Sequence, residues 1–531
     1  MEGMRARMPF FLLVACAATA CGRTGFPGAG GDPSPTPTTP PDGPLVVSVS
    51  SAVAEIRPAL RDVPVRVTLQ NTGGIAVTEV RVALDFRQGD GADRRPDFFA
   101  EEAPWADEVG AGASADVDFE VDVSPSAETE DLFVLARVWY RAGAAAHADS
   151  SAGLAWSWLP LREILVDNAA DENDGEVEDD VTLREAIEYA NGQPGADRIR
   201  FDGDYDIRIA TALPVLQGNS APILLDGAGK DVTLSPDGLP NGQWMLRAEG
   251  AAAIHALRFE APGSLYPVYD ISTNNCNGGE QSGGAVVVQG GTGASVTGST
   301  FDDQGVAERN CFAATIRIDG GFEHHIAGNV FLDVVGDAVS VRTGGLAEFS
   351  RNLVIRARDD GIFVGAPSGP TRVVGNVFAG VQLSAVFASG DSADAVLTLL
   401  HNTYVKNGRG AVYRGSSRRV HARNEAYFEN TGAAIVLQSS DAGGGIDLDF
   451  VATSGNALCQ GMGTCGSLTV GTNLVTTGSF ALPDPDGEAW PDFAPAAGSA
   501  LVDRGADRRD RAPERGRWLG AGPDIGAVES R

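Results

Sequence analysis

Residues 328–331 read Gly-Asn-Val-Phe, and this small-Asn-x-apolar pattern recurs every 22 to 26 residues from about Ser299 to Leu437. The segments between turns are four to six residues long and rich in Val, Ile and Phe, which is typical of short strands. A unit this short buries no core of its own, so successive units must stack. The sequence therefore predicts an all-β right-handed parallel β-helix, with one coil per repeat and coils about 4.8 Å apart.

One position of the repeat predicts a ladder inside the coil. Asparagine tolerates the left-handed backbone of a sharp corner, and its amide can bond the asparagine of the next coil. The ladder is expected to begin one coil earlier, at Ser299. A binding role is the alternative to this structural role. The expected members are Asn329, Asn352, Asn376, Asn402 and Asn424.

Length and charge limit the classes of function. At 531 residues the chain is expected to hold two or more domains. Its formal net charge of −31 argues against nucleic acid as a partner, because phosphate binding needs a basic face. An acidic surface favours solubility and cation binding instead.

The N-terminus has the pattern of a targeting segment. Arg5 and Arg7 precede an apolar run over residues 10–15, which is too short to span a membrane. The segment resembles a bacterial lipoprotein signal, in which the cysteine after the cleavage site carries the lipid. Lipidation of Cys21 removes Cys16 and leaves an even number of cysteines, so we prefer Cys21, with Cys16 as the alternative.

The resemblance implies a lipoprotein signal peptide over residues 1–21 and an exported protein, lipid-anchored to the bacterial membrane at the outer membrane or cell surface. Residues 22–44 are rich in Gly, Pro and Thr and predict a tether.

Residues 45–160 predict a small antiparallel β-sandwich of about seven strands. Val63–Leu69 and Val77–Val82 alternate apolar and polar residues, and Asn71–Gly74 between them has the composition of a hairpin turn. The stretch Val67–Gly73 resembles the CARDB-type, immunoglobulin-like modules of bacterial cell-adhesion proteins. That resemblance implies a spacer or binding unit without catalytic residues.

A second resemblance accompanies the start of the β-helix, which we assign to residues 161–480. Val181–Ile187 resembles the initial segment of bacterial surface proteins named for a Cys-Ser-Leu-Arg-Glu-Ala motif, although Val181 and Thr182 replace the Cys and Ser. Leu183–Asn191 predicts an amphipathic helix that caps the open end of the coil.

A third resemblance covers the C-terminal cap segment, residues 481–531. Pro495–Gly505, followed by Pro523–Glu529, resembles the terminal segment of the choice-of-anchor Q surface proteins. The resemblances at the start and at the end of the β-helix imply a fold and a surface location, but they imply no particular reaction.

The cysteines suggest an oxidising compartment. Cys459 and Cys465 lie close together in a Gly-rich loop and are expected to pair. Cys276 and Cys311 sit in insertions that precede matching strands of adjacent coils, so a second disulfide is expected there. A metal site is the rival interpretation, but the spacing does not suit zinc.

Carboxylates stack at two positions of the repeat. Asp337 and Asp360 both follow their ladder asparagine by eight residues, which predicts neighbouring places about 5 Å apart. Asp303, Asp333 and Arg356 form a second column, four residues after the ladder.

The stacked residues are the candidate site. Asp337, Asp360 and Arg356 are the candidate catalytic residues, and Asp303 and Asp333 the candidate ligands of Ca²⁺, which takes six to eight oxygens. Alternatively, all four aspartates, Asp303, Asp333, Asp337 and Asp360, together bind the Ca²⁺. Arg356 would face a substrate carboxylate. Ordinary corner residues are the alternative.

Two further patterns bear on the site. Asp359 is expected to point away from Asp360, and residues 358–361 resemble polygalacturonase sequences. His324 and His325 are expected to lie exposed on a turn, as an acid/base pair or without a role.

The overall architecture resembles the pectate-lyase-like superfamily, whose members bind or act on polysaccharides. We therefore expect a monomeric surface protein that binds polysaccharide or another surface partner without catalysis. The alternative is a Ca²⁺-dependent polysaccharide lyase or glycoside hydrolase that acts on an acidic polysaccharide. A purely structural stalk is the third possibility.

Overall fold

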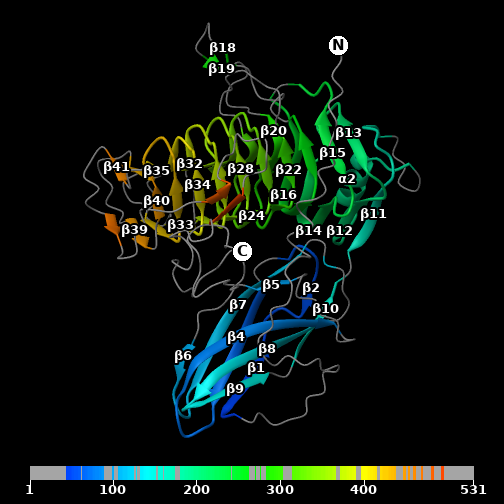
Figure 1. Ribbon diagram of the computed structural model, residues 1–531. Helices are drawn as coiled ribbons and strands as arrows, with labels where there is room; N and C mark the ends of the chain where they lie inside the picture. Colours follow the sequence, from blue (N-terminus) through cyan, green and yellow to red (C-terminus); the bar gives the residue numbers. More distant parts are fainter. Residues whose placement is uncertain are drawn as a thin grey trace.

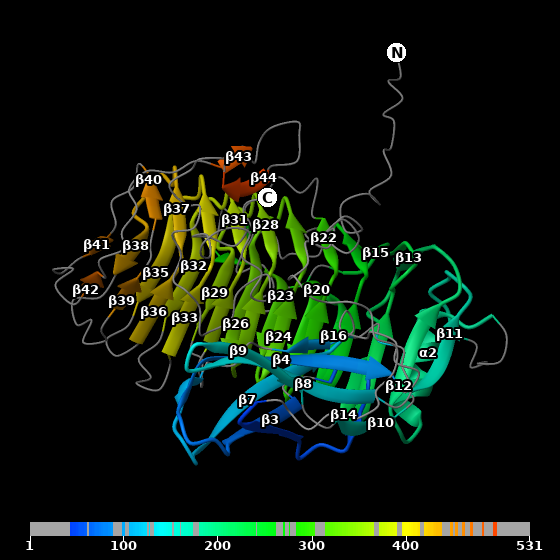
Figure 2. The same ribbon diagram turned by 60° about the horizontal axis from the view of Figure 1, so that its bottom comes forward.

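The computed structural model shows two bodies made almost entirely of strands, an antiparallel sandwich and a long parallel coil (Figures 1 and 2). The description covers residues 43–60, 63–88, 98–100, 106–124, 127, 132–150, 153–159, 161–173, 180–240, 242–261, 269–270, 275–276, 283–302, 314–365, 371–389, 396–414, 419–437, 446–449, 452–454, 459–461, 468–470, 480–482 and 492–495.

The sandwich consists of two sheets around one apolar core. Along β3 (Val63–Asn71) buried and solvent-facing residues alternate, as expected for a strand with one face on the core. The four-stranded sheet has the order β1 (Leu45–Ser50), β3, β7 (Ser114–Val123), β5 (Phe98–Ala100). The six-stranded sheet has the order β2 (Glu55–Ile56), β10 (Leu154–Trp158), β8 (Leu132–Ala142), β4 (Val77–Gln88), β6 (Ala106–Val109), with β9 (Ala145–Ser150) beside β8.

The predicted hairpin at Asn71–Gly74 is wrong. β3 pairs with β1 and β7, whereas β4 pairs with β6 and β8, so this turn crosses from one sheet to the other. The buried Asn71 side chain holds the crossing by donating Nδ2 to the carbonyl oxygens of Ile75 and Val109, at 2.8 and 3.0 Å. A local turn motif did not reveal this because sheet membership is set by distant strands.

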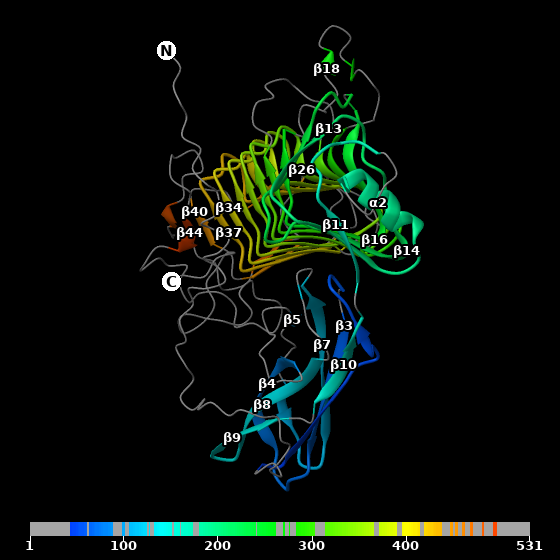
Figure 3. The same cartoon turned by 90° about the vertical axis from the view of Figure 1, so that its right-hand side faces the viewer.

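A helix covers the first coil, as the sequence predicts. Helix α2 (Leu183–Gly192) begins at Thr182 with a reciprocal capping box to Glu185, and it buries Leu183 and Ile187. Figure 3 shows α2 at the end of the coil, beside β11 (Arg162–Val166). The helix also packs against β12 (Asp197–Phe201) and β14 (Leu216–Asp226), so the apolar end of the stack is shielded from water.

Each coil contributes three strands, and each strand pairs in parallel with its equivalent one coil away. The long strands β14 and β16 (Trp244–His255) bend across two faces, which together make one 20-stranded sheet. Its first face runs through β20 (Gly284–Gln289), β23 (Ala314–Asp319), β26 (Asp337–Thr343), β29 (Ile362–Val364), β32 (Ser384–Ser389), β35 (Arg409–Arg414), β38 (Ile435–Leu437) and β41 (Cys459–Gly461).

The second face of this sheet runs through β21 (Ser295–Thr297), β24 (His324–Ala327), β27 (Leu346–Ser350), β30 (Thr371–Val374), β33 (Val396–Leu400), β36 (Arg419–Arg423), β39 (Ile446–Asp449) and β42 (Leu468–Val470). The third face is a separate 10-stranded sheet of β13 (Tyr205–Ile209), β15 (Val232–Pro236), β17 (Arg258–Glu260), β22 (Thr300–Asp302), β25 (Val330–Leu332), β28 (Leu353–Ile355), β31 (Val377–Ala379), β34 (Thr403–Val405), β37 (Ala426–Phe428) and β40 (Ala452–Ser454). Two short pairs lie apart from the coil: β18 (Tyr269–Asp270) with β19 (Asn275–Cys276), and β43 (Phe480–Leu482) with β44 (Asp492–Pro495).

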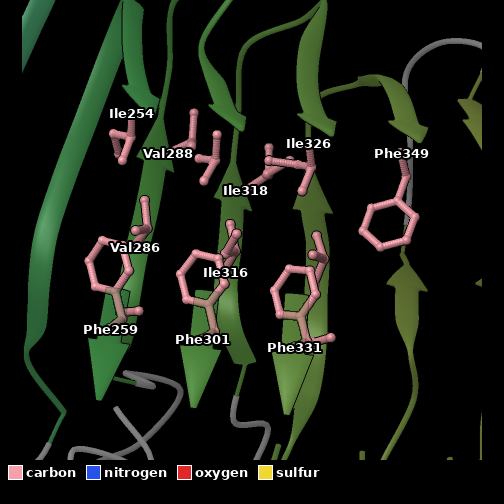
Figure 4. Packing of buried hydrophobic residues seen from close by; sticks show 14 of the residues in the cluster. Ile254, Phe259, Val286, Val288, Phe301, Ile316, Ile318, Ile326, Phe331 and Phe349 are labelled. Carbon is pink, nitrogen blue, oxygen red and sulfur yellow. The ribbon is translucent and has the colours of Figure 1, made fainter. Parts of the chain in front are cut away.

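Stacked side chains fill the coil. Figure 4 shows Phe259, Phe301 and Phe331 in one row, and successive rings lie 4.9 Å apart between centroids. Val354 interrupts the row on β28, and Phe349 from β27 contributes the next ring. Such ring pairs add about 0.5–1.5 kcal/mol each beyond their buried area.

A buried polar ladder runs beside the aromatic row, as predicted for four of the five asparagines. The backbone N–H of Asn329 donates to Asn352 Oδ1 at 2.9 Å, and its Nδ2 donates to the same oxygen at 3.1 Å. The same arrangement joins Asn352 to Asn376 and Asn376 to Asn402. Ser299 begins the ladder by donating its backbone N–H to Asn329 Oδ1.

The predicted fifth member of the ladder is wrong by one residue. The strand register pairs Thr403 with Ala426, so Glu425 follows Asn402 in the ladder. Asn424 instead occupies the preceding corner, where its φ of 54° matches the 57° of His401. Asparagine is favoured there because its side chain tolerates the left-handed region, which is the first of the two properties expected, whereas the ladder position itself belongs to Glu425.

Several predictions concern residues that the structure does not describe. These are the signal peptide, Cys16, Cys21 and the tether up to residue 42, together with Asp303 and most of the C-terminal segment. Both expected disulfides also fall outside, because no side chain of the four cysteines is described. Among the described residues, no helix is both long and apolar enough to cross a membrane.

Candidate functional site

Two aspartates occupy equivalent places on the first face of neighbouring coils, as the sequence predicts. Val339 pairs with Ile362, which sets Asp337 at the start of β26 opposite Asp360. The backbone N–H of Asp360 donates to Asp337 Oδ1 at 3.2 Å. The N–H of Ser384, one coil further on, donates to Asp360 Oδ1 at 2.9 Å. The two carboxyl groups are therefore held by backbone donors of the next coil.

A third carboxyl group joins them, against expectation. One carboxylate oxygen from each of Asp337, Asp359 and Asp360 lies within 4.8 Å of the other two. Asp359 was expected to point away, because neighbouring strand residues alternate in direction. It lies instead in the turn between β28 and β29, where alternation does not apply. We call these three residues the carboxyl cluster.

Burial makes the cluster hard to ionise fully. Asp337 and Asp360 are 5% and 6% exposed, whereas Asp359 is half-buried. Desolvation, and then the nearby charge of Asp359, raise the pKa of Asp360 to about 7. Desolvation and the other two aspartates raise the pKa of Asp337 well above its ordinary value. Simultaneous ionisation of all three carboxyl groups at neutral pH is therefore unfavourable.

Two arginines near the cluster oppose the rise in pKa, and they act on different aspartates. The charge of Arg342 favours the ionised forms of Asp337 and Asp359, and the charge of Arg409 favours that of Asp360. Arg342 is itself held in place, since its Nε donates to Ser340 Oγ at 3.2 Å and its guanidinium lies 5.5 Å from the ring centroid of Phe363. The cluster thus combines a carboxyl group that protonates near neutral pH with neighbours that carry charge.

The second predicted column forms an ion pair instead of a metal site. Arg356 donates Nε and Nη2 to the two oxygens of Asp333, at 2.6 and 3.0 Å. Both oxygens of Asp333 accept hydrogen bonds from Arg356, and this pairing gives no support to the expected role of Asp333 as a Ca²⁺ ligand. Arg356 is likewise directed at a carboxylate of its own chain.

The two histidines were expected to be exposed, but they are buried. His324 and His325 lie in β24 and are 0% and 5% exposed. His324 Nε2 lies 3.0 Å from the carbonyl oxygen of Gly320, and burial lowers the pKa of its imidazole. Their buried position gives no support to an acid/base pair.

Sequence reasoning missed Glu425, a buried acid in the ladder. Glu425 is 0% exposed, and burial raises its pKa to about 8. Asn402 donates to it from the backbone and the side chain, and Tyr404 donates its hydroxyl at 2.7 Å. The aromatic row was the available signal, because Phe331, Phe378 and Tyr404 each follow a ladder asparagine by two positions, as Tyr427 follows Glu425.

The carboxyl cluster is the only group of three or more Cys, His, Asp or Glu residues in the described part of the chain that is arranged to hold a metal ion. It supplies three protein ligands, fewer than the six to eight oxygens of Ca²⁺, so water or substrate would complete the shell. Two of its oxygens already accept backbone hydrogen bonds.

A comparison with protein families agrees with the type of fold. Residues 264–441 match the model of a protein family described as right-handed β-helix region. The comparison with curated proteins gives no match.

Three of the solved structures that are similar to the chain are the following. A family 28 exopolygalacturonase from Yersinia enterocolitica has a TM-score of 0.33 at 9% identity, over 82% of this chain and 99% of that one. The catalytic domain of a GH87 α-1,3-glucanase has a TM-score of 0.27 at 10% identity, over 81% and 98%. The Agl-KA catalytic domain has a TM-score of 0.29 at 11% identity, over 82% and 96%. Similarities this low carry no inference about activity.

Proposed function

We propose that the β-helix hydrolyses a glycosidic bond of a polysaccharide at the carboxyl cluster. The observation that carries this proposal is the close approach of three carboxyl groups, one with a pKa of about 7. Glycoside hydrolysis needs a carboxylic acid that is still protonated near neutral pH, beside a carboxylate. This geometry favours the enzyme over the non-catalytic binding protein that the sequence suggested first.

The three residues have different environments, which assign their roles. Asp360 is the general acid that protonates the leaving oxygen, because burial and Asp359 keep its proton near neutral pH. Burial raises the pKa of Asp359 as well, but Asp359 is the most exposed of the three and the charge of Arg342 opposes that rise, so it serves as the carboxylate partner. Asp337 positions Asp360 by accepting the backbone N–H of that residue.

Cation binding is the second candidate role for the cluster, and it rests on the same three oxygens. Ca²⁺ would displace the shared proton, because ligand carboxylates must be ionised. The cluster would then bind an acidic polysaccharide through the ion or support a lyase reaction. Activity or affinity that chelators abolish and Ca²⁺ restores would favour this role over hydrolysis.

The test is a reducing-sugar assay and an unsaturated-product assay of the full chain on a panel of acidic and neutral polysaccharides, with Ca²⁺ and with chelator. Under the proposal one polymer is hydrolysed without formation of unsaturated ends. Asp360→Asn should lower kcat by about 100-fold or more, which is the usual contribution of a general acid. Asp359→Asn should have an effect of similar size.

Asp333→Asn is the matched control, because Asp333 also follows a coil strand but is paired with Arg356. It should leave turnover unchanged. Turnover that survives Asp360→Asn would overturn the assignment of the site. Retention on a polymer without any turnover would return the protein to the class of binding proteins.

We also propose that the protein is exported and anchored by a lipid on Cys21. The support is the order of basic residues, apolar run and cysteine at the N-terminus. Metabolic labelling with a fatty acid, compared between Cys21→Ser and Cys16→Ser, tests the site. Label that is lost only in Cys16→Ser would move the anchor to that residue.

A further inference from the structure

A tryptophan flanked by three arginines lies on the outer face of the six-stranded sheet of the sandwich. Trp139 of β8 is 40% exposed, and the strand register places Arg81 of β4 directly opposite. Arg137 and Arg141 precede and follow Trp139 by two residues, so their side chains leave the same face of the strand. Trp139 therefore has an arginine residue as its neighbour on three sides.

Two of these guanidinium groups are held in fixed positions. Arg137 donates Nη2 to Asp85 Oδ2 at 2.7 Å, and Asp85 is only 3% exposed. Arg141 donates Nε to Glu79 at 2.9 Å. A guanidinium has five N–H donors, so one carboxylate partner leaves donors directed toward solvent. The buried carboxylate of Asp85 thus orders Arg137 before any ligand arrives, which lowers the entropy cost of binding.

The fourth side of the indole is open. Ala148 of β9 pairs with Trp139, and Ala146 pairs with Arg141, so only small side chains border this edge. Phe133 lies on the same face six residues before Trp139 and is 37% exposed. Six residues of extended strand span about 20 Å, so the two rings mark the ends of a long, narrow strip.

The opposite sheet of the sandwich has a different character. Arg66 on β3 pairs with Asp118 at 2.6 Å and lies 3.8 Å from Asp116, both on β7. No large aromatic side chain is among the exposed residues of that sheet in the described part of the chain. The strip around Trp139 is therefore a local cationic and aromatic surface in a chain whose net charge is −31.

We propose that this strip binds an acidic polysaccharide, with a sugar ring on the indole of Trp139 and sugar carboxylates on Arg137, Arg141 and Arg81. Arginine matches the planar geometry of a carboxylate, and tryptophan presents a large apolar surface at low entropy cost. The strip follows β8 over about 20 Å and includes Arg81 of the neighbouring β4, which suits a chain of sugar rings. A stable protein interface covers about 800 Å² on each partner, so a narrow strip suits a polysaccharide better than a protein partner.

The experiment measures binding of the full chain to alginate by isothermal titration calorimetry. Dextran is the neutral control polymer, and poly-glutamate is the control for charge on a peptide. Alginate should bind, with an affinity that falls as salt rises, because exposed charges are screened. Trp139→Ala and Arg137→Gln should each weaken binding by about 10-fold or more, equal to about 1.4 kcal/mol.

Arg66→Gln is the matched control, since it removes an exposed, ion-paired arginine from the other sheet, and it should bind like the wild type. Far-ultraviolet circular dichroism verifies that each variant is folded. Equal binding of dextran or poly-glutamate, equal loss in Arg66→Gln, or self-association through this face instead of alginate binding would overturn the proposal.

Discussion

Asn402 donates its backbone N–H and its Nδ2 to one oxygen of Glu425, at 3.0 and 3.1 Å, in the place where each preceding coil offers an asparagine amide. A carboxyl group in this position accepts as an amide does, but it can lose a proton. Its pKa of about 8 lies far above the ordinary 4.5. The buried ladder therefore contains a group whose charge depends on pH.

The stability of the coil should fall as pH rises. The folded state holds the Glu425 proton up to pH 8, whereas the unfolded chain releases it near pH 4.5. Stability from this residue is therefore complete below pH 4.5 and is lost progressively up to pH 8, at about 1.4 kcal/mol per unit. Urea unfolding of wild type and Glu425→Gln at pH 5 and pH 8.5 measures the difference. Identical pH dependence in both proteins would contradict the assignment.

Asp337→Asn should stabilise the protein above neutral pH while it lowers activity. Burial and two neighbouring carboxyl groups raise the pKa of Asp337, so ionisation at high pH destabilises the folded state. An asparagine keeps an oxygen to accept the Asp360 N–H and removes that penalty. The midpoint of thermal unfolding should rise at pH 8 and change little at pH 4. A lower midpoint at pH 8 would show that the carboxylate is matched by a cation.

Arg356→Ala should have little effect on either stability or turnover. Its side chain and that of Asp333 are 38% and 30% exposed, and ion pairs at such positions contribute about 0–1 kcal/mol. Turnover of the polymer identified above and denaturant unfolding are the two measurements. A loss of kcat with unchanged stability would restore Arg356 to the catalytic residues and would require the column to face the substrate.

Asn376→Ala should be costly because Asn376 lies in the middle of the ladder. Its amide accepts from Asn352 and donates to the carbonyl oxygen of Phe349, so removal leaves buried backbone groups unpaired. We expect a loss of roughly 3 kcal/mol or more in the free energy of unfolding. Asn173→Ala, at an exposed asparagine, is the control and should cost little. Equal losses would mean that the ladder contributes no special stability.

The architecture was predictable because the repeat is periodic and each coil packs only on its neighbours. The interval between Asn329 and Asn352 already implied the register that pairs Phe331 with Val354. The same periodicity predicted from the sequence alone that Asp337 lies opposite Asp360. The prediction of the ladder was wrong at one corner of the coil. The letter Asn at position 424 hid the true equivalence of Glu425, which the aromatic spacing would have revealed.

The chemistry of the site was less predictable, because it depends on turn geometry and burial. Strand alternation gave the wrong direction for Asp359, which lies in a turn. The stacking of the coils could not show that Arg356 forms an ion pair with Asp333. It also could not show that the charge of Arg342 opposes the rise in the pKa of Asp337 and Asp359. These relationships depend on side-chain positions that no spacing rule encodes.

The direction of the hydrogen bonds in the 20-stranded sheet has a mechanical consequence. Each bond between equivalent strands, such as those joining β26, β29 and β32, lies along the axis of the coil. A force along this axis would peel coils away one at a time, each at low load. A force across the axis would shear many bonds together. The protein should therefore resist lateral drag far better than axial tension.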